Sequence, residues 1–218
     1  MSVLDRLIGA LRGHKIGVLG ERGVGKTHLQ TFLRTGNIPA VYEQTVGQNR
    51  LASGRAQLWA IEGLGPPTNF KLALKSAYDV PGAAEAVEAW REVVGEATIL
   101  LYLFRADLVF NKESTHLQRM HEDARLIADL INERTRSKLK VAMLGTHYDM
   151  VPGYRGPLTG TAFYKWHTLI EEDSDVDAVR LRIGSSVTDT PALVVGSMRT
   201  VPDTQDIAFR LFPRELRP

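Results

Sequence analysis

Residues 20–27 read Gly-Glu-Arg-Gly-Val-Gly-Lys-Thr and match the pattern G-x-x-x-x-G-K-[ST] without a gap. The apolar run 15–19 before them predicts a short buried strand, and the apolar residues between 29 and 33 recur at helical spacing. In a strand–turn–helix setting, this pattern surrounds phosphate with backbone N–H groups at the start of a helix. The stretch therefore predicts a phosphate-binding loop, in which Lys26 reaches the β- and γ-phosphates and Thr27 ligates Mg²⁺.

The composition fits one globular domain. The chain has 218 residues, of which 44% are hydrophobic and 24% charged, and its net charge of +2 gives no nucleic-acid footprint. It has no cysteine, which excludes disulfides, thiolate catalysis and cysteine-based zinc sites and fits a reducing compartment. No apolar run is long enough to span a bilayer, and the N-terminus lacks signal-peptide features. We therefore expect a cytoplasmic protein.

Strand-like and helix-like stretches alternate along the chain. Strands are expected over 97–104, 140–144 and 192–195, and helices over 83–94, 114–135, 162–170 and 203–212, whereas 171–189 is less regular. Strands over 56–61 and 70–78, joined by a Gly/Pro-rich turn at 63–69, predict an antiparallel hairpin. This order predicts an α/β fold: a mostly parallel sheet with helices on both faces and one antiparallel edge hairpin. The expected domain covers 14–218 and follows an amphipathic helix over 1–13.

Two further motifs fall at predicted strand ends, where ligands of parallel sheets bind. In Asp79-Val80-Pro81-Gly82, Asp79 can hold Mg²⁺ through water and the Gly82 N–H can meet the γ-phosphate, unless Asp79 only caps the following helix. Asp149 can accept two hydrogen bonds from the ring N–H and the amine of guanine, which adenine cannot supply. Backbone N–H groups of Gly196-Ser197-Met198 can face the base carbonyl oxygen.

The order of these motifs resembles that of Ras-like small GTPases. The glycine loop, Thr45, Asp79-x-x-Gly82, Thr146-x-x-Asp149 and Gly196-Ser197 are similar to their five guanine-nucleotide motifs, over residues 15–212. Thr45-Val46-Gly47-Gln48-Asn49 and Trp90-Arg91 look like Arf signatures, and MglA-type GTPases share much of this pattern. The resemblance implies a three-layer P-loop NTPase fold that binds GTP or GDP with Mg²⁺. Compared with a minimal Ras-like domain, insertions are expected near 48–70 and 151–190.

The resemblance also implies roles for individual residues. Catalysis would involve Lys26, Thr45 and Gly82, and the metal ligands would be Thr27, Thr45 and Asp79. The nucleotide would contact Arg22, Gly23, Val24, Gly25, Lys26, Thr27, His28, Thr146, His147, Asp149, Ser197 and Met198. The loops around Thr45 and Gly82 would change conformation with the γ-phosphate and recruit an effector or regulator protein.

Several residues depart from the family pattern. Ala83 stands where relatives carry the glutamine that orients the attacking water, so intrinsic hydrolysis should be slow. Arg22 could act as an arginine finger in cis, block one supplied in trans, or remain a solvated loop residue. His147 replaces a lysine that stacks on the base, which an imidazole can also do. The expected function is a GTP-dependent switch with slow hydrolysis; the alternatives are an interaction module with little or no turnover and an ATPase.

Three remaining features are two histidines, an acidic run and an apolar stripe near the N-terminus. His116 and His121 lack zinc spacing and are expected on the surface, and the acidic run 171–175 is expected to be a solvated loop rather than a calcium site. The apolar stripe over 2–12 can pack on the domain or a partner, or act as a membrane-surface or switch-controlled helix. Residue 2 is serine, which excludes N-myristoylation from this start.

Overall fold

The computed structural model describes residues 15–35, 37–39, 49–51, 77–79, 87–135, 138–154 and 167–215. The predicted helix over 1–13, Thr45, Gly82 and Ala83 lie outside these ranges. So do most of the predicted insertion near 48–70 and residues 155–166 of the one near 151–190.

Strands and helices alternate through the described part of the chain. They are β1 (Ile16–Gly20), α2 (Lys26–Thr35), β2 (Asn49–Leu51), β3 (Ala77–Asp79), α3 (Val87–Glu96), β4 (Ile99–Arg105), α4 (Ala106–Phe110), α5 (Ser114–Asn132), β5 (Lys140–Thr146), the 3₁₀ helix η2 (Tyr148–Met150), α7 (Ser174–Gly184), β6 (Ala192–Val195) and α8 (Val201–Glu215). Residues 167–171 form a further short helical stretch.

The strands pair in the order β2-β3-β1-β4-β5-β6. β1 lies parallel to both β3 and β4, and β5 lies parallel to both β4 and β6. This confirms the prediction of a mostly parallel sheet. At one edge, β2 pairs antiparallel with β3, with Asn49 opposite Asp79. The predicted hairpin remains a prediction, because its first strand (56–61) and its turn (63–69) lie outside the described residues.

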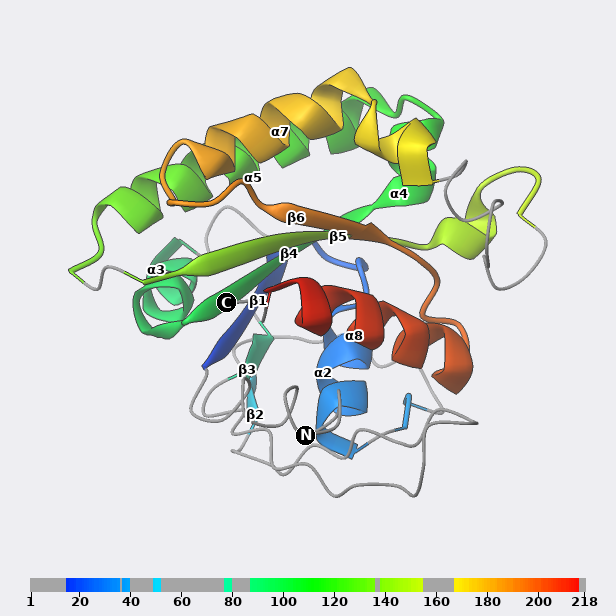
Figure 1. Cartoon of the computed structure of the whole chain (residues 1–218), viewed down its shortest axis with the longest axis horizontal. Coiled ribbons are helices and arrows are strands. Elements are labelled where there is room, and N and C mark those ends of the chain that lie inside the picture. Colours follow the sequence, from blue (N-terminus) through cyan, green and yellow to red (C-terminus); the bar gives the residue numbers. More distant parts are fainter. Residues whose placement is uncertain are drawn as a thin grey trace.

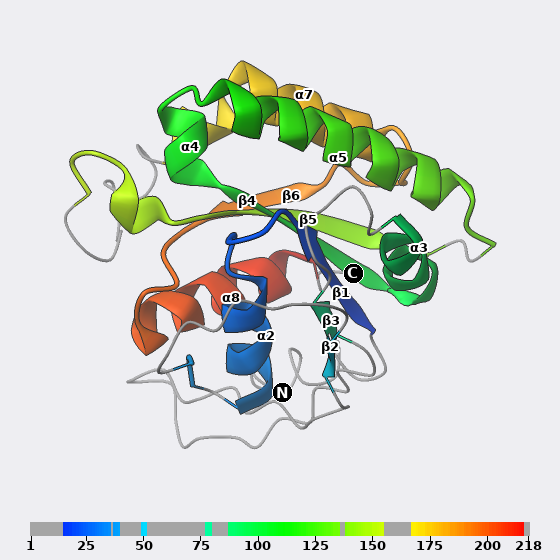
Figure 2. The ribbon, with the colours of Figure 1, turned by 180° about the vertical axis from the view of Figure 1, so that it is seen from behind.

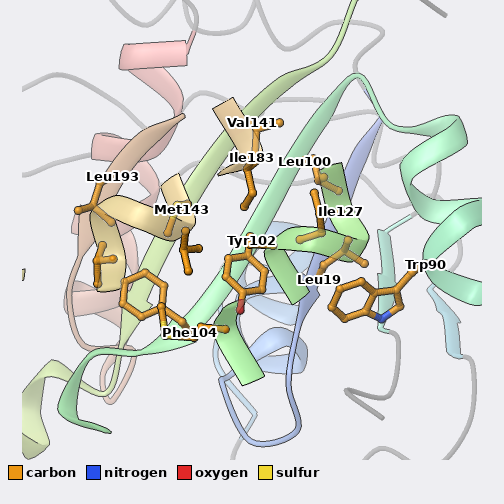
Figure 3. Packing of buried hydrophobic residues seen from close by; sticks show 14 of the residues in the cluster. Leu19, Trp90, Leu100, Tyr102, Phe104, Ile127, Val141, Met143, Ile183 and Leu193 are labelled. Atoms are coloured by element: carbon orange, nitrogen blue, oxygen red, sulfur yellow. The ribbon is translucent and has the colours of Figure 1, made fainter. Parts of the chain in front are cut away.

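The central strands are buried on both faces because their side chains alternate between two apolar cores. In β4, Leu100, Tyr102 and Phe104 belong to one core, and the odd-numbered residues between them belong to the other. Figure 3 shows the first core, where these three side chains point toward residues of the covering helices, among them Ile127 and Ile183. A strand buried on both faces needs an almost unbroken apolar sequence, which is the pattern of 99–104.

Helices cover both faces of the sheet, as predicted. α3, α5 and α7 supply the first core, and α2 and α8 supply the second with residues such as Phe32 and Leu211. Figure 1 shows α5 and α7 side by side above the sheet, with α2 and α8 below it. Trp90 on α3 is 1% exposed and belongs to the first core. The described residues therefore form a three-layer α/β arrangement.

The prediction for residues 171–189 was wrong, because 174–184 form the regular helix α7. The Asp173 carboxylate caps this helix by accepting from the backbone N–H groups of Asp175 and Val176, at 3.0 and 3.3 Å. Asp173 also lies 2.6 Å from the ammonium of Lys112, so the acidic run is a capped helix start and not a solvated loop. The buried residues Val176, Val179 and Ile183 recur at helical spacing, but the surrounding charges obscure that signal.

The close approach of α3 to β1 generates a testable prediction. A Cβ added at Gly17 would lie 2.6 Å from Val93 Cγ1 and 3.2 Å from the Ala97 Cβ, so the Gly17→Ala substitution overpacks this contact. We expect it to lower the free energy of unfolding by about 1–3 kcal/mol in urea denaturation. Gly95 in α3 is the matched control, because nothing lies within 4 Å of an added Cβ there. Gly95→Ala should raise stability by up to about 1 kcal/mol; equal stabilities of the two variants would contradict the prediction.

Candidate functional site

The glycine-rich loop connects β1 to α2. Its backbone conformation requires glycine at position 25, where φ is +90° and an added Cβ would lie 2.2 Å from the Cε atom of Met198. Met198 belongs to the segment after β6, so this contact joins the loop to a distant part of the sequence. The loop therefore depends on tertiary packing as well as on its own sequence.

Lys26 begins α2, and its side chain folds back over the loop. It is only 6% exposed, and its Nζ donates to the carbonyl oxygens of Gly20 and Glu21 at 3.1 and 2.9 Å. The backbone N–H groups in the first turn of a helix have no intrahelical acceptor and carry the positive end of the helix dipole. A buried ammonium beside such a turn forms an electropositive cradle that suits an anion.

The end of β5 carries a buried threonine followed by a histidine in the left-handed conformation. Thr146 is fully buried, and its Oγ1 donates to the Phe104 carbonyl oxygen at 3.1 Å. The same Oγ1 lies 2.9 Å from Nδ1 of His147. Because the only hydroxyl hydrogen is used toward Phe104, Nδ1 of His147 must be the donor, and its Nε2 is left as an acceptor. His147 has φ of +57°, which turns the chain sharply into η2.

The backbone of Asp149 is held in place by contacts of the neighbouring residue Tyr148. Tyr148 is 1% exposed, its ring packs edge-on against Tyr154 with centroids 6.0 Å apart, and its N–H donates to the Gly196 carbonyl oxygen at 3.3 Å. This anchors η2 between two strand ends. The carboxylate of Asp149 accepts no hydrogen bond from the part of the chain that the structure describes, and it lines a pocket.

The pocket, of about 200 Å³, joins segments that lie far apart in the sequence. It is lined by Gly23, Gly25, His28, His147, Asp149, Met198 and Arg199. Figure 2 shows why these residues meet: the loop after β1, η2 after β5 and the connection from β6 to α8 all lie at the same end of the sheet. Every lining residue except Arg199 was predicted from the sequence as a site residue.

The two histidines of the pocket both favour the neutral form. Burial lowers the pKa of His28 and, more than any other cause, the pKa of His147, whose pKa is lowered further by the charge of Arg105. Arg105 is the last residue of β4, and its Nε donates to the Asp107 carboxylate at 2.9 Å. At neutral pH, Arg199 and Asp149 are therefore the charged side chains that line the pocket.

Other predicted site residues occupy supporting positions. The Val24 side chain is buried in the second core, Thr146 supports His147, and the Ser197 Oγ accepts from the N–H of Arg199 at 3.0 Å. Arg22 is exposed. These positions leave the backbone of Val24 and Ser197, rather than their side chains, available to a ligand.

The structure does not test the predicted metal ligands as a set. Asp79 ends β3 beside β1, opposite Val18, but its side chain, Thr45 and Gly82 lie outside what is described; Thr27 is described at the start of α2. Within the described ranges, no group of three or more His, Cys, Asp or Glu side chains could hold a metal ion.

Sequence reasoning missed two features of this end of the sheet. Arg199 was not singled out, although its place directly after the β6 turn was a usable signal. His116 was expected on the surface, but it is only 4% exposed and its Nδ1 lies 2.6 Å from the Glu21 carboxylate. His121 is half-buried and pairs with Asp175, at 3.1 Å. His116 lies four residues before Met120 on the buried stripe of α5, so helical periodicity was a usable signal for its burial but not for its contact with Glu21.

Neither a protein-family model nor a curated protein sequence matches this chain. A functional assignment therefore rests on the motif residues and on the geometry of this pocket.

The buried His147 predicts a pH dependence of stability. Because its pKa is lowered in the folded state, the unfolded chain binds a proton first as the pH falls below about 6.5, and this side chain then destabilises the fold. His147→Asn removes the imidazole and tolerates the left-handed backbone. We expect the variant to lose less unfolding free energy than the wild type between about pH 7.5 and pH 5.5 in urea denaturation.

The comparison of the two proteins isolates His147 from other groups that titrate in this range. His28 also has a lowered pKa, and burial raises the pKa of Asp123 to about 6, but both are present in each protein. Identical pH slopes for the wild type and the variant would contradict the assignment of a destabilising proton to His147.

Proposed function

We propose that the protein is a GTP-binding molecular switch of the Ras-like P-loop class, with a slow, Mg²⁺-dependent GTPase activity. The observation that carries the proposal is the pocket, in which the glycine loop (Gly23, Gly25), Asp149 and the segment after β6 (Met198, Arg199) meet. A nucleotide needs a phosphate cradle and a base-reading group at one site, and no one of these segments supplies both.

The glycine loop supports the part of the proposal that concerns phosphate binding. The Lys26 ammonium donates hydrogen bonds to the carbonyl oxygens of Gly20 and Glu21. The charged oxygens of a triphosphate are stronger acceptors for the same ammonium. The residues proposed to hold Mg²⁺ are Thr27, Thr45 and Asp79, and the bound ion would neutralise phosphate charge during hydrolysis.

Asp149 supports the part of the proposal that concerns recognition of the guanine base. Its carboxylate lines the pocket and accepts no hydrogen bond within the described part of the chain, so both oxygens are available to a ligand. Guanine presents two adjacent N–H donors on its ring N1 and exocyclic amine, which match one carboxylate. Adenine has an acceptor at its ring nitrogen and would leave the carboxylate unpaired, which is costly in a pocket. His147 and His28 are apolar-faced rings beside the same space and can pack on the base.

Calorimetry with Mg²⁺ tests nucleotide binding. GTP and GDP should bind, ATP should bind far more weakly, and Lys26→Ala should weaken GTP binding by about a hundredfold or more. Asp149→Asn should cost GTP about a hundredfold and favour xanthosine triphosphate, whose carbonyl at the position of the amine matches the new amide donor. Equal affinity for ATP and GTP, unchanged by Asp149→Asn, would point to an ATPase. Absence of GDP and GTP binding would reject the proposal.

Hydrolysis separates the switch from the alternative of an interaction module in which bound GTP is structural. Ala83 favours the module, because relatives carry the water-orienting glutamine there. We expect single-turnover hydrolysis slightly above background, abolished in Lys26→Ala and Asp79→Ala. Ala83→Gln should accelerate it by about tenfold or more. Turnover at background level in the wild type, with GTP still bound, would favour the module.

Partner recruitment is proposed to use the loops around Thr45 and Gly82, with an effector or regulator protein as the partner. Residues 2–12 are proposed as a second contact, with a partner or a membrane surface. In the described part of the chain, no helix combines the length and apolarity that crossing a bilayer requires. We propose a cytoplasmic location; the alternative is peripheral attachment to a membrane through residues 2–12.

A further inference from the structure

The glycine loop carries a carboxylate, Glu21, at its start. The side chain is 23% exposed, and its Oε1 lies 2.6 Å from Nδ1 of His116, whose own side chain is 3% exposed. His116 is on α5, so this contact links the loop to a helix of the opposite layer from α2. An acidic side chain is unexpected beside a cradle of N–H groups that suits anions.

The protonation of His116 decides the charge of this pair. The backbone N–H of Arg105 donates to Nε2 of His116 at 3.3 Å, so this nitrogen carries a lone pair and no proton. The single ring hydrogen is therefore on Nδ1, where it is donated to the Glu21 carboxylate. Because the ring is neutral, the hydrogen bond fixes the carboxylate without cancelling its charge, and the pair keeps a net charge of −1.

The nearby cations are engaged by other carboxylates. Arg105 donates to Asp107, and Arg119 Nε lies 2.8 Å from Oδ1 of Asp123. In the described part of the chain, no Lys or Arg side chain forms an ion pair with Glu21. The negative charge of Glu21 contributes, after burial, to the raised pKa values of Asp123 and Tyr102. The field of this carboxylate therefore extends into the surrounding structure.

The same residue touches the proposed phosphate-binding lysine. The Glu21 carbonyl oxygen accepts from Lys26 Nζ at 2.9 Å, so the residue that bears the carboxylate is tied directly to the proposed phosphate-binding ammonium. A fixed negative charge at that place attracts Lys26 and repels an incoming phosphate tail. At an effective dielectric constant of about 20, a like charge on the same loop can change affinity by about an order of magnitude.

We propose that Glu21, held in place by His116, is a specificity-determining residue that lowers the affinity of the site for a nucleoside triphosphate relative to the diphosphate. This inference rests on the proposed nucleotide-binding function. The repulsion grows with the charge of the phosphate tail, so it penalises GTP more than GDP. It thereby favours the diphosphate state and accelerates release of the triphosphate.

The test measures dissociation constants of GTP and GDP with Mg²⁺ by calorimetry for the wild type and for Glu21→Gln. The glutamine keeps the size of the side chain and an oxygen that can accept from His116, and it removes only the charge. We expect Glu21→Gln to bind GTP about tenfold more tightly and GDP less so, which lowers the ratio of the GTP and GDP dissociation constants by about threefold or more. GTP dissociation, followed with a fluorescent analogue, should slow in parallel.

Three variants control the measurement. Glu21→Asp retains the charge and should keep a ratio close to that of the wild type. Glu172→Gln makes the same charge change at an exposed position between the 167–171 helix and α7, and it should leave the ratio unchanged. Glu21→Ala removes the charge by a different route and serves if Glu21→Gln does not fold; it should shift the ratio in the same direction.

The outcomes separate the inference from the function on which it rests. If the wild type binds GTP and GDP but neither uncharged variant lowers the ratio, the inference is overturned and the proposed function stands. A shift of equal size in Glu172→Gln would also overturn it, because the effect would then reflect net charge alone. If the wild type binds neither nucleotide, both the function and the inference are rejected.

Discussion

The parallel pairing of β1 with β4, and of β5 with β4 and β6, is the constraint on which the rest of the structure depends. Strands that run in the same direction end at the same edge of a sheet, so the loops that follow them converge there. The pocket exists because residues after positions 20, 146 and 195 reach that edge together. Residues that are far apart in the sequence therefore lie close together at this edge.

The sheet can hold this edge in place because it is buried on both faces. The alternating side chains of β4 and β5 enter two separate cores, and helices from different parts of the chain close each core. Burial of apolar area on both faces is the main favourable contribution to stability in such an architecture. Rigid strands then allow the turns at their ends to hold strained or left-handed conformations, as His147 and Gly25 do.

Buried hydrogen bonds also hold the residues of the candidate site in position. Thr146 connects Phe104 to His147, Tyr148 connects η2 to Gly196, and His116 connects α5 to Glu21. Each contact satisfies polar groups that would be costly to bury unpaired, and each fixes a loop residue relative to a neighbouring strand or helix. The candidate site is therefore positioned by hydrogen bonds as well as by strand geometry.

The sequence by itself determined most of the local elements and the position of the glycine loop. The apolar runs predicted β4, β5 and β6, the alternation of elements predicted a parallel sheet with helices on both faces, and the glycine pattern located the turn before α2. These features are local, because periodicity and turn residues act over a few positions. Charges dense enough to obscure the apolar spacing of α7 were the reason that this helix was missed.

Only the tertiary structure decided which side chains meet. The sequence shows Glu21 and His116 as unrelated residues, and nothing in it indicates that the Met198 side chain lies against Gly25. Such pairs arise when strand order and helix packing bring distant segments together, and no local pattern encodes that distance. For the same reason, the charge balance of the site follows from the folded arrangement and not from composition.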